Sequence, residues 1–143
     1  MSTPMGSLSK LLDELTGLLE RLSEEAERGT PIIVEGPSDV EALRTLGIHG
    51  TFVAVKACRK PLVDVVHDIP VSAGGEVILL MDFDRAGREQ ARKLAEELTG
   101  FGFKVNLSYW HYLMALVGSF AKDIEGLPSL VETLMRKVGP RLK

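Results

Sequence analysis

The chain has 143 residues, of which 45% are hydrophobic and 26% charged, a composition typical of one globular domain with a continuous core. Its net charge of −3 provides no overall basic field for a nucleic acid or a membrane surface. The single cysteine, Cys58, excludes an internal disulfide, and no apolar run approaches the roughly 18 residues that span a bilayer. We therefore expect a cytoplasmic protein with no membrane partner.

Residues 7–28 predict an N-terminal amphipathic helix. Leucines recur there at spacings of three and four, charged residues occupy the other face, and Gly29 is a typical helix end. We treat residues 1–29 as an N-terminal helical unit and expect its leucine face to dock onto the domain's own sheet. The alternative is that this face forms the seam of a homodimer or of a protein complex.

Strand and helix patterns alternate over residues 30–143, which we interpret as one globular unit. Apolar runs predict strands in 31–36, 51–55, 76–82 and 104–108. Amphipathic or capped segments predict helices over 38–46, 60–67, 86–98 and 128–138, after a mixed segment that follows the last strand. This alternation predicts an open α/β fold in which about four parallel strands are sandwiched by helices.

The residues that follow the predicted strands are the candidates for chemistry, because the carboxyl ends of parallel strands meet at one edge, where ligands bind. Glu35 follows the first strand, and Asp82 and Asp84 follow the third. Clustered carboxylates repel one another unless a proton or a cation compensates them, and Mg²⁺ binds through carboxylates, waters and phosphate. The structural alternative is that Asp82 caps the following helix and Asp84 is a turn residue.

Other residues near this edge have supporting roles to play. Gly36 allows a tight turn after its strand, and Gly87 allows a close approach in the first turn of its helix. Ser38 or Asp39 caps the first helix of the sheet, and Asp39 also supports the metal ligands. Basic side chains at the edge either neutralise phosphate or remain solvated: Lys56, Arg59, Lys60, Arg85 and Arg88.

Several other chemistries find no support in the residue pattern. The histidines lack zinc-ligand spacing, and neither a phosphate-binding glycine loop nor a serine nucleophile elbow is present. Tyr109, Trp110 and Tyr112 either pack a helix onto the sheet or stack on bases, and we favour packing.

Three segments in this order resemble the Toprim family, the catalytic domain of bacterial-type primases, topoisomerases, nucleases and ribosomal RNA maturases. The segments are "VEGPSDVEAL" at 34–43, "MDFDRAGREQA" at 81–91 and "KDIEG" at 122–126. The likeness covers about residues 31–126 and is greatest to small stand-alone archaeal proteins. It implies a Rossmann-like Toprim fold, with the N-terminal helix as an addition.

The resemblance also implies roles for individual residues. Asp82 and Asp84 would bind Mg²⁺, with Mn²⁺ as a substitute, and Glu35 would be a general acid/base or a metal ligand. Lys122 and Asp123 match the short segment beyond the last strand. Because no accessory primase domain and no breakage-domain tyrosine accompany the motifs, primer synthesis and topoisomerase activity are not expected.

Three functions remain open at this point. The first is a Mg²⁺-dependent nuclease that acts on RNA or DNA. The second is a non-catalytic Toprim module that binds nucleic acid within a larger processing complex. The third, a small-molecule phosphotransferase or phosphatase, suits the Asp-x-Asp pair but leaves Glu35 without a role.

Overall fold

The computed structural model describes residues 5–56, 61–70 and 73–139 and forms an α/β sandwich. The strands are β1 (Ile32–Val34), β2 (Phe52–Ala54), β3 (Glu76–Leu79) and β4 (Lys104–Asn106). The helices are α1 (Met5–Glu27), α2 (Pro37–Thr45), α3 (Leu62–His67), α4 (Arg85–Gly100), α5 (Ser108–Val117) and α6 (Leu127–Val138), and a 3₁₀ turn, η1 (Ala73–Gly75), precedes β3.

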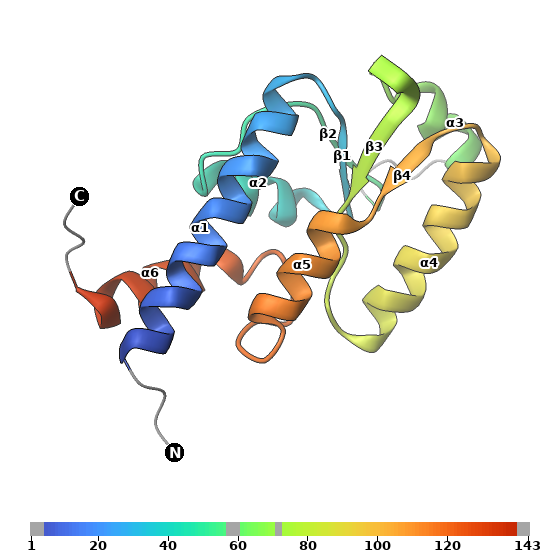
Figure 1. The fold of residues 1–143 in the computed structure, drawn as a ribbon. Helices are drawn as coiled ribbons and strands as arrows, with labels where there is room; N and C mark the ends of the chain where they lie inside the picture. Colours follow the sequence, from blue (N-terminus) through green and yellow to red (C-terminus); the bar gives the residue numbers. More distant parts are fainter. Residues whose placement is uncertain (1–4, 57–60, 71–72, 140–143) are drawn as a thin grey trace.

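The four strands are all parallel and lie in the order β2-β1-β3-β4. Figure 1 shows α1, α2, α5 and α6 on one side of this sheet and α3 and α4 on the other. This division follows from handedness, because right-handed crossovers that run in opposite directions across a sheet place their helices on opposite faces. The predicted α/β class, parallel sheet and covering helices are confirmed.

The central strands carry the core. Every residue of β1 is fully buried, as are the last three of β3, whereas the edge strands β2 and β4 are only partly buried. The chain stays on the sheet beyond β3, because the Leu80 N–H donates to the Ile33 carbonyl at 2.9 Å. The continuous apolar runs at 32–34 and 77–81 are thus explained by helices on both faces.

Helix α1 buries its leucine face inside the domain, as expected. It packs against α5 and α6, the neighbouring helices of its layer (Figure 1), and its leucines join the same core cluster as the residues of β1 and β3. Its buried leucines are Leu12, Leu15, Leu18, Leu19 and Leu22. Because these side chains are already covered within the chain, the alternative of a homodimer or complex seam on this face gains no support.

The predicted helix ends agree with the backbone. Gly29 and Gly47, which follow α1 and α2, have φ values of +96° and +88°, a region that favours glycine. One helix was missed: the mixed segment after the fourth strand contains α5, which begins at Ser108, a residue assigned to that strand from sequence. This segment is rich in aromatic and aliphatic residues on both faces, with Trp110 buried and Tyr112 exposed, so it lacks the alternation of apolar and polar faces that predicts a helix.

Within the described ranges, no helix is both long and apolar enough to cross a membrane.

Candidate metal and phosphate site

The candidate site lies where the sheet changes direction. From β1 the chain moves outward to β2, then returns across β1 to β3 and continues to β4 on the other side. The adjacent strands β1 and β3 therefore flank the topological switch point, outside whose carboxyl edge ligands bind in open α/β sheets. Glu35 follows β1 and the segment leading to Asp82 follows β3, so both acids lie at this edge.

Glu35 is held beside a lysine from the neighbouring strand. Its carboxylate forms an ion pair with the Lys56 ammonium, and the Lys56 N–H donates to the Glu35 carbonyl at 2.9 Å. The side chain of Glu35 is 19% exposed and that of Lys56 is 64% exposed, so the pair opens to solvent at the rim. A hydrogen bond from the ammonium to Glu35, together with the charge of that carboxylate, raises the pKa of Lys56.

Asp39 fastens the start of α2 next to Glu35. Its carboxylate accepts a hydrogen bond from the Gly36 N–H at 3.0 Å, so Asp39 holds the helix start from within the first turn. Gly36 itself has an extended backbone and nothing near its missing side chain, so the turn there does not require glycine. Burial, opposed by the Gly36 hydrogen bond and reinforced by Glu35, raises the pKa of the Asp39 carboxyl.

Asp82 is the most perturbed acid of the described chain. Burial comes first among the causes that raise its pKa to about 7, followed by the charges of Glu35, Asp39 and Asp123 and by a hydrogen bond with Glu35. A carboxyl with this pKa holds a proton about half of the time at neutral pH. The hydrogen bond also means that the carboxyl groups of Glu35 and Asp82 lie within direct reach of each other.

Backbone contacts on both sides fix the position of Asp82. The Trp110 indole N–H donates to the Met81 carbonyl at 2.7 Å, and the Phe83 N–H donates to the Lys122 carbonyl at 2.7 Å. A Cβ on Gly87 would lie 2.3 Å from the Asp82 carbonyl oxygen, which is far inside van der Waals contact. Glycine is therefore required at the third position of α4, and the expected close approach of Gly87 is confirmed.

Asp84 begins α4. Its Oδ1 accepts a hydrogen bond from the Gly87 N–H at 2.7 Å, the geometry of an N-terminal cap. The structural alternative assigned this cap to Asp82, and that assignment is wrong, because Asp84 is the N-cap residue of α4. An ionised carboxylate has acceptor sites on both oxygens, so the cap leaves Asp84 with capacity for a ligand.

The segment at 122–126 returns to the same edge between α5 and α6. The carboxylate of Asp123 accepts from the Gly126 N–H at 2.8 Å, and its charge contributes to the raised pKa of both Asp39 and Asp82. Lys122 contributes its backbone carbonyl, while its side chain is exposed. The three motif segments, distant in sequence, thus surround Asp82.

The oxygen donors that the structure describes at the site are of the kind that bind a hard divalent cation, although their positions do not form a complete set of ligands. Glu35 and Asp82 are neighbouring oxygen donors; burial and their mutual repulsion raise the pKa of Asp82, and a cation can replace the proton of Asp82. Among the residues that the structure describes, no three carboxylate, histidine or cysteine side chains converge closely enough to hold an ion together. Glu35 and Asp82 are in direct contact, and a third protein ligand would require reorientation of a neighbouring acid such as Asp84, Asp39 or Asp123.

The predicted basic residues divide into three groups. Lys56 lies at the site, beside Glu35. Arg85 is exposed and pairs with Glu89 at 3.6 Å, whereas Arg88 points over a cavity beside α4. The remaining two predicted bases, Arg59 and Lys60, and also Cys58, lie outside the described residues.

Reasoning from sequence missed Trp110 as a residue that positions Asp82. Its signal was present, because a lone tryptophan shortly after a strand of the sheet is a natural donor to a buried backbone carbonyl.

Comparison with known proteins agrees with this geometry. A family model of the Toprim domain matches residues 30–110. The chain is 40% identical over 119 residues to a UPF0292 protein of Methanocaldococcus jannaschii, covering 83% of this chain and 91% of that one. It is 38% identical over 130 residues to a UPF0292 protein of Methanosarcina acetivorans, covering 91% and 88% respectively.

A solved structure of a protein from Aquifex aeolicus has the same arrangement, with a TM-score of 0.64 and 28% identity. The match covers 78% of this chain and 95% of that one. The family match spans more than half of the chain and includes Glu35, Asp82 and Asp84, and the relatives are matched over most of their length. The chain belongs to the Toprim domain family.

Proposed function

We propose that this protein is a small Mg²⁺-dependent nuclease that cleaves phosphodiester bonds in RNA or DNA. The observation that carries the proposal is the hydrogen-bonded pair of Glu35 and Asp82 at the switch point of the sheet. Toprim domains act on nucleic acid and generally bind Mg²⁺, which agrees with such a pair. Burial and the neighbouring carboxylates raise the pKa of Asp82, and a divalent cation at the pair would relieve the repulsion between the carboxylates.

Each acid has a distinct task in this proposal. Glu35 and Asp82 would hold the ion, Asp84 would supply a further oxygen, and Asp39 keeps the start of α2 in place through Gly36. When bound, Mg²⁺ or Mn²⁺ supplies a Lewis acid that stabilises charge on the phosphoryl oxygens. Lys56, which is exposed beside Glu35, neutralises a phosphate that enters the rim.

Glu35 is the group placed to move a proton. It contacts Asp82 on one side and Lys56 on the other, and its side chain remains partly open to solvent. A general acid/base needs this access together with a partner that fixes its orientation. Glu35 therefore accepts a proton from the attacking water or returns one to the leaving oxygen.

A non-catalytic nucleic-acid module is the second candidate, and one observation favours it. The Oδ1 atom of Asp84 is engaged by the Gly87 N–H, and no three ligands converge within the described residues. A site with two ready ligands can bind a cation weakly and hold a phosphate without cleaving it. In that role the protein acts within a larger RNA or DNA processing complex.

Cleavage assays separate the two candidates. Labelled structured RNA, single-stranded DNA and duplex DNA are incubated with Mg²⁺ or Mn²⁺ and either wild type or Asp82→Asn/Asp84→Asn. A Glu24→Gln/Glu27→Gln protein is the matched control, because it removes two exposed acids near the end of α1. The nuclease proposal expects cleavage by wild type and control only. Cleavage that survives in the double variant overturns the site assignment, and binding without cleavage by wild type favours the module.

A further inference from the structure

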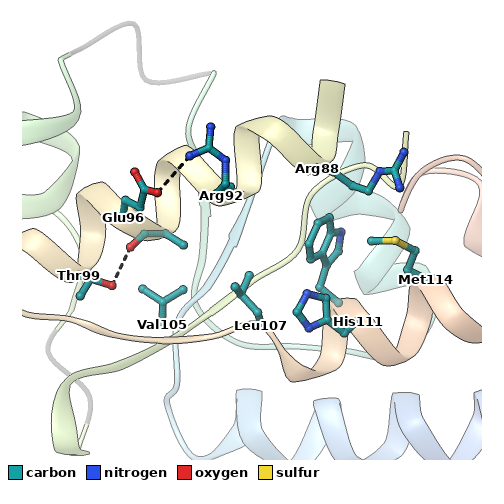
Figure 2. A pocket seen from close by; sticks show the side chains of 10 residues that line it. Arg88, Arg92, Glu96, Thr99, Val105, Leu107, His111 and Met114 are labelled. Carbon is teal, nitrogen blue, oxygen red and sulfur yellow. Dashed lines mark hydrogen bonds and ion pairs between the residues drawn. The ribbon is translucent and has the colours of Figure 1, made fainter. Parts of the chain in front are cut away.

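A second concave surface lies beside the candidate site, on the far side of α4. A cavity of about 730 Å³ opens between α4 and α5 along β4, the edge strand of the sheet. Figure 2 shows Arg88 and Arg92 on one wall, Val105 and Leu107 on the floor, and His111 on the wall formed by α5. Its volume is within the range of pockets that hold a small organic ligand.

The floor of the cavity suits a flat apolar group. Val105, Leu107 and Met114 line it, together with the Trp110 ring. The exposed His111 ring lies 5.3 Å from the buried Trp110 ring between centroids and is tilted by 37° to it, so His111 provides the open aromatic face of the cavity. Aromatic rings on an apolar floor are the feature on which unpaired bases stack.

The opposite wall carries positive charge. Arg88 and Arg92 are four residues apart, so they share one face of α4, and both line the cavity together with Glu96. Arg92 pairs with Glu96 at 3.1 Å, whereas Arg88 forms no ion pair with any residue that the structure describes. A planar guanidinium is the side chain that best grips a phosphate through two hydrogen bonds.

The cavity is directly coupled to the candidate site. Trp110, which lines it, donates to the carbonyl of Met81, the residue before Asp82. Arg88 is four residues along α4 from the cap residue Asp84, which corresponds to about 6 Å along the helix axis.

We propose that the cavity binds one unpaired nucleotide of a single-stranded substrate, with its base against the exposed His111 ring and the apolar floor and its phosphate at Arg88 and Arg92. This inference rests on the proposed function, which it deepens by naming single-stranded nucleic acid as the substrate class. A base held in a duplex is stacked and paired, so it is not available to enter the cavity.

The test uses the fluorescence of Trp110, the only tryptophan of the chain. The full-length protein is titrated without divalent cations with single-stranded oligonucleotides of RNA and DNA, with a duplex of the same sequence, and with adenosine monophosphate. Single strands are expected to quench the fluorescence in a saturable way and at least 10-fold more tightly than the duplex or the mononucleotide. Anisotropy of a labelled strand provides an independent measure of the same affinity.

Variants localise the binding to the cavity. Ala95→Phe fills it from α4, and Arg88→Ala/Arg92→Ala removes its positive wall. Each is expected to weaken single-strand binding by about 10-fold, the size of one lost stacking or phosphate contact. The matched control is Lys93→Ala/Arg136→Ala, which removes two exposed cations outside the cavity and should leave the affinity unchanged. Thermal melts confirm that each variant is folded.

The outcomes separate this inference from the proposed function. Equal affinity for the duplex, equal affinity for the mononucleotide, or unchanged binding in both cavity variants would overturn the inference, even if wild type cleaves nucleic acid. Saturable single-strand binding that is lost in the cavity variants supports the inference, even if no cleavage is found.

Discussion

Substitution of Gly87 by alanine is the sharpest perturbation of the candidate site that leaves every charge in place. The added Cβ would lie 2.3 Å from the Asp82 carbonyl oxygen, 2.7 Å from the carbonyl carbon and 2.8 Å from Asp82 Cβ. Because ordinary contact begins near 3.4 Å, the Asp82 backbone or the start of α4 must move by about 1 Å. Overpacking of this kind typically costs about 1–3 kcal/mol of unfolding free energy.

The same displacement should weaken cation binding more than it weakens the fold. Mg²⁺ demands ligand distances of about 2.0–2.1 Å in near-octahedral geometry, so a movement of about 1 Å at Asp82 breaks the site. Urea unfolding measures the first effect, and calorimetric titration with Mn²⁺ measures the second.

Gly100→Ala is the matched control for this substitution. Gly100 belongs to the same helix and has nothing within 4 Å of the added carbon, so the change should be neutral or stabilise by up to about 1 kcal/mol. If Gly87→Ala unfolds at the same urea concentration as wild type and binds Mn²⁺ equally well, the proposed packing of α4 on Asp82 is refuted.

Three further outcomes are expected. Because burial and neighbouring carboxylates raise the pKa of Asp82 from 3.8 to about 7, the folded protein binds an extra proton between these values. The free energy of unfolding of wild type should therefore fall as pH rises through this window. Asp82→Asn removes the titrating group, so its free energy of unfolding relative to wild type should be about 1–2 kcal/mol higher at pH 8 than at pH 4, allowing for solvent screening. Urea unfolding at the two pH values measures this difference. Mn²⁺ affinity should drop by up to 10-fold for each pH unit below 7, with release of a proton that calorimetry in two buffers detects. Trp110→Phe should cost about 1–3 kcal/mol by leaving the Met81 carbonyl unpaired, whereas Tyr112→Phe, at an exposed position, should cost nothing.

The fold could be predicted from sequence where burial produces a recognisable pattern of apolar residues. The runs at 32–34 and 77–81 are apolar throughout because helices cover both faces of β1 and β3, and such runs are readily recognised as buried strands. Helix α5 lacks a clear amphipathic pattern, because exposed Tyr112 and partly buried Leu116 lie on the face where polar residues would be expected.

The residues of the candidate site could be predicted from sequence, whereas the contacts between them could not. Strand ends are visible in sequence, so Glu35 and Asp82 could be assigned to one edge. Which aspartate caps α4 depends on the exact residue at which the helix begins, and helix ends are not fixed by sequence patterns to one residue. The Trp110 contact with Met81 joins residues 29 positions apart and depends on the packing of an unpredicted helix.

Direct measurement of cation binding tests the central claim, that Glu35 and Asp82 form a divalent-cation site. Paramagnetic resonance of free Mn²⁺, titrated with protein at pH 8, gives the number of bound ions and their affinity. Wild type and the Glu24→Gln/Glu27→Gln control are expected to bind one ion per chain, and Glu35→Gln/Asp82→Asn to bind it at least 10-fold more weakly. Equal binding by all three proteins, or no binding by wild type, would contradict the account.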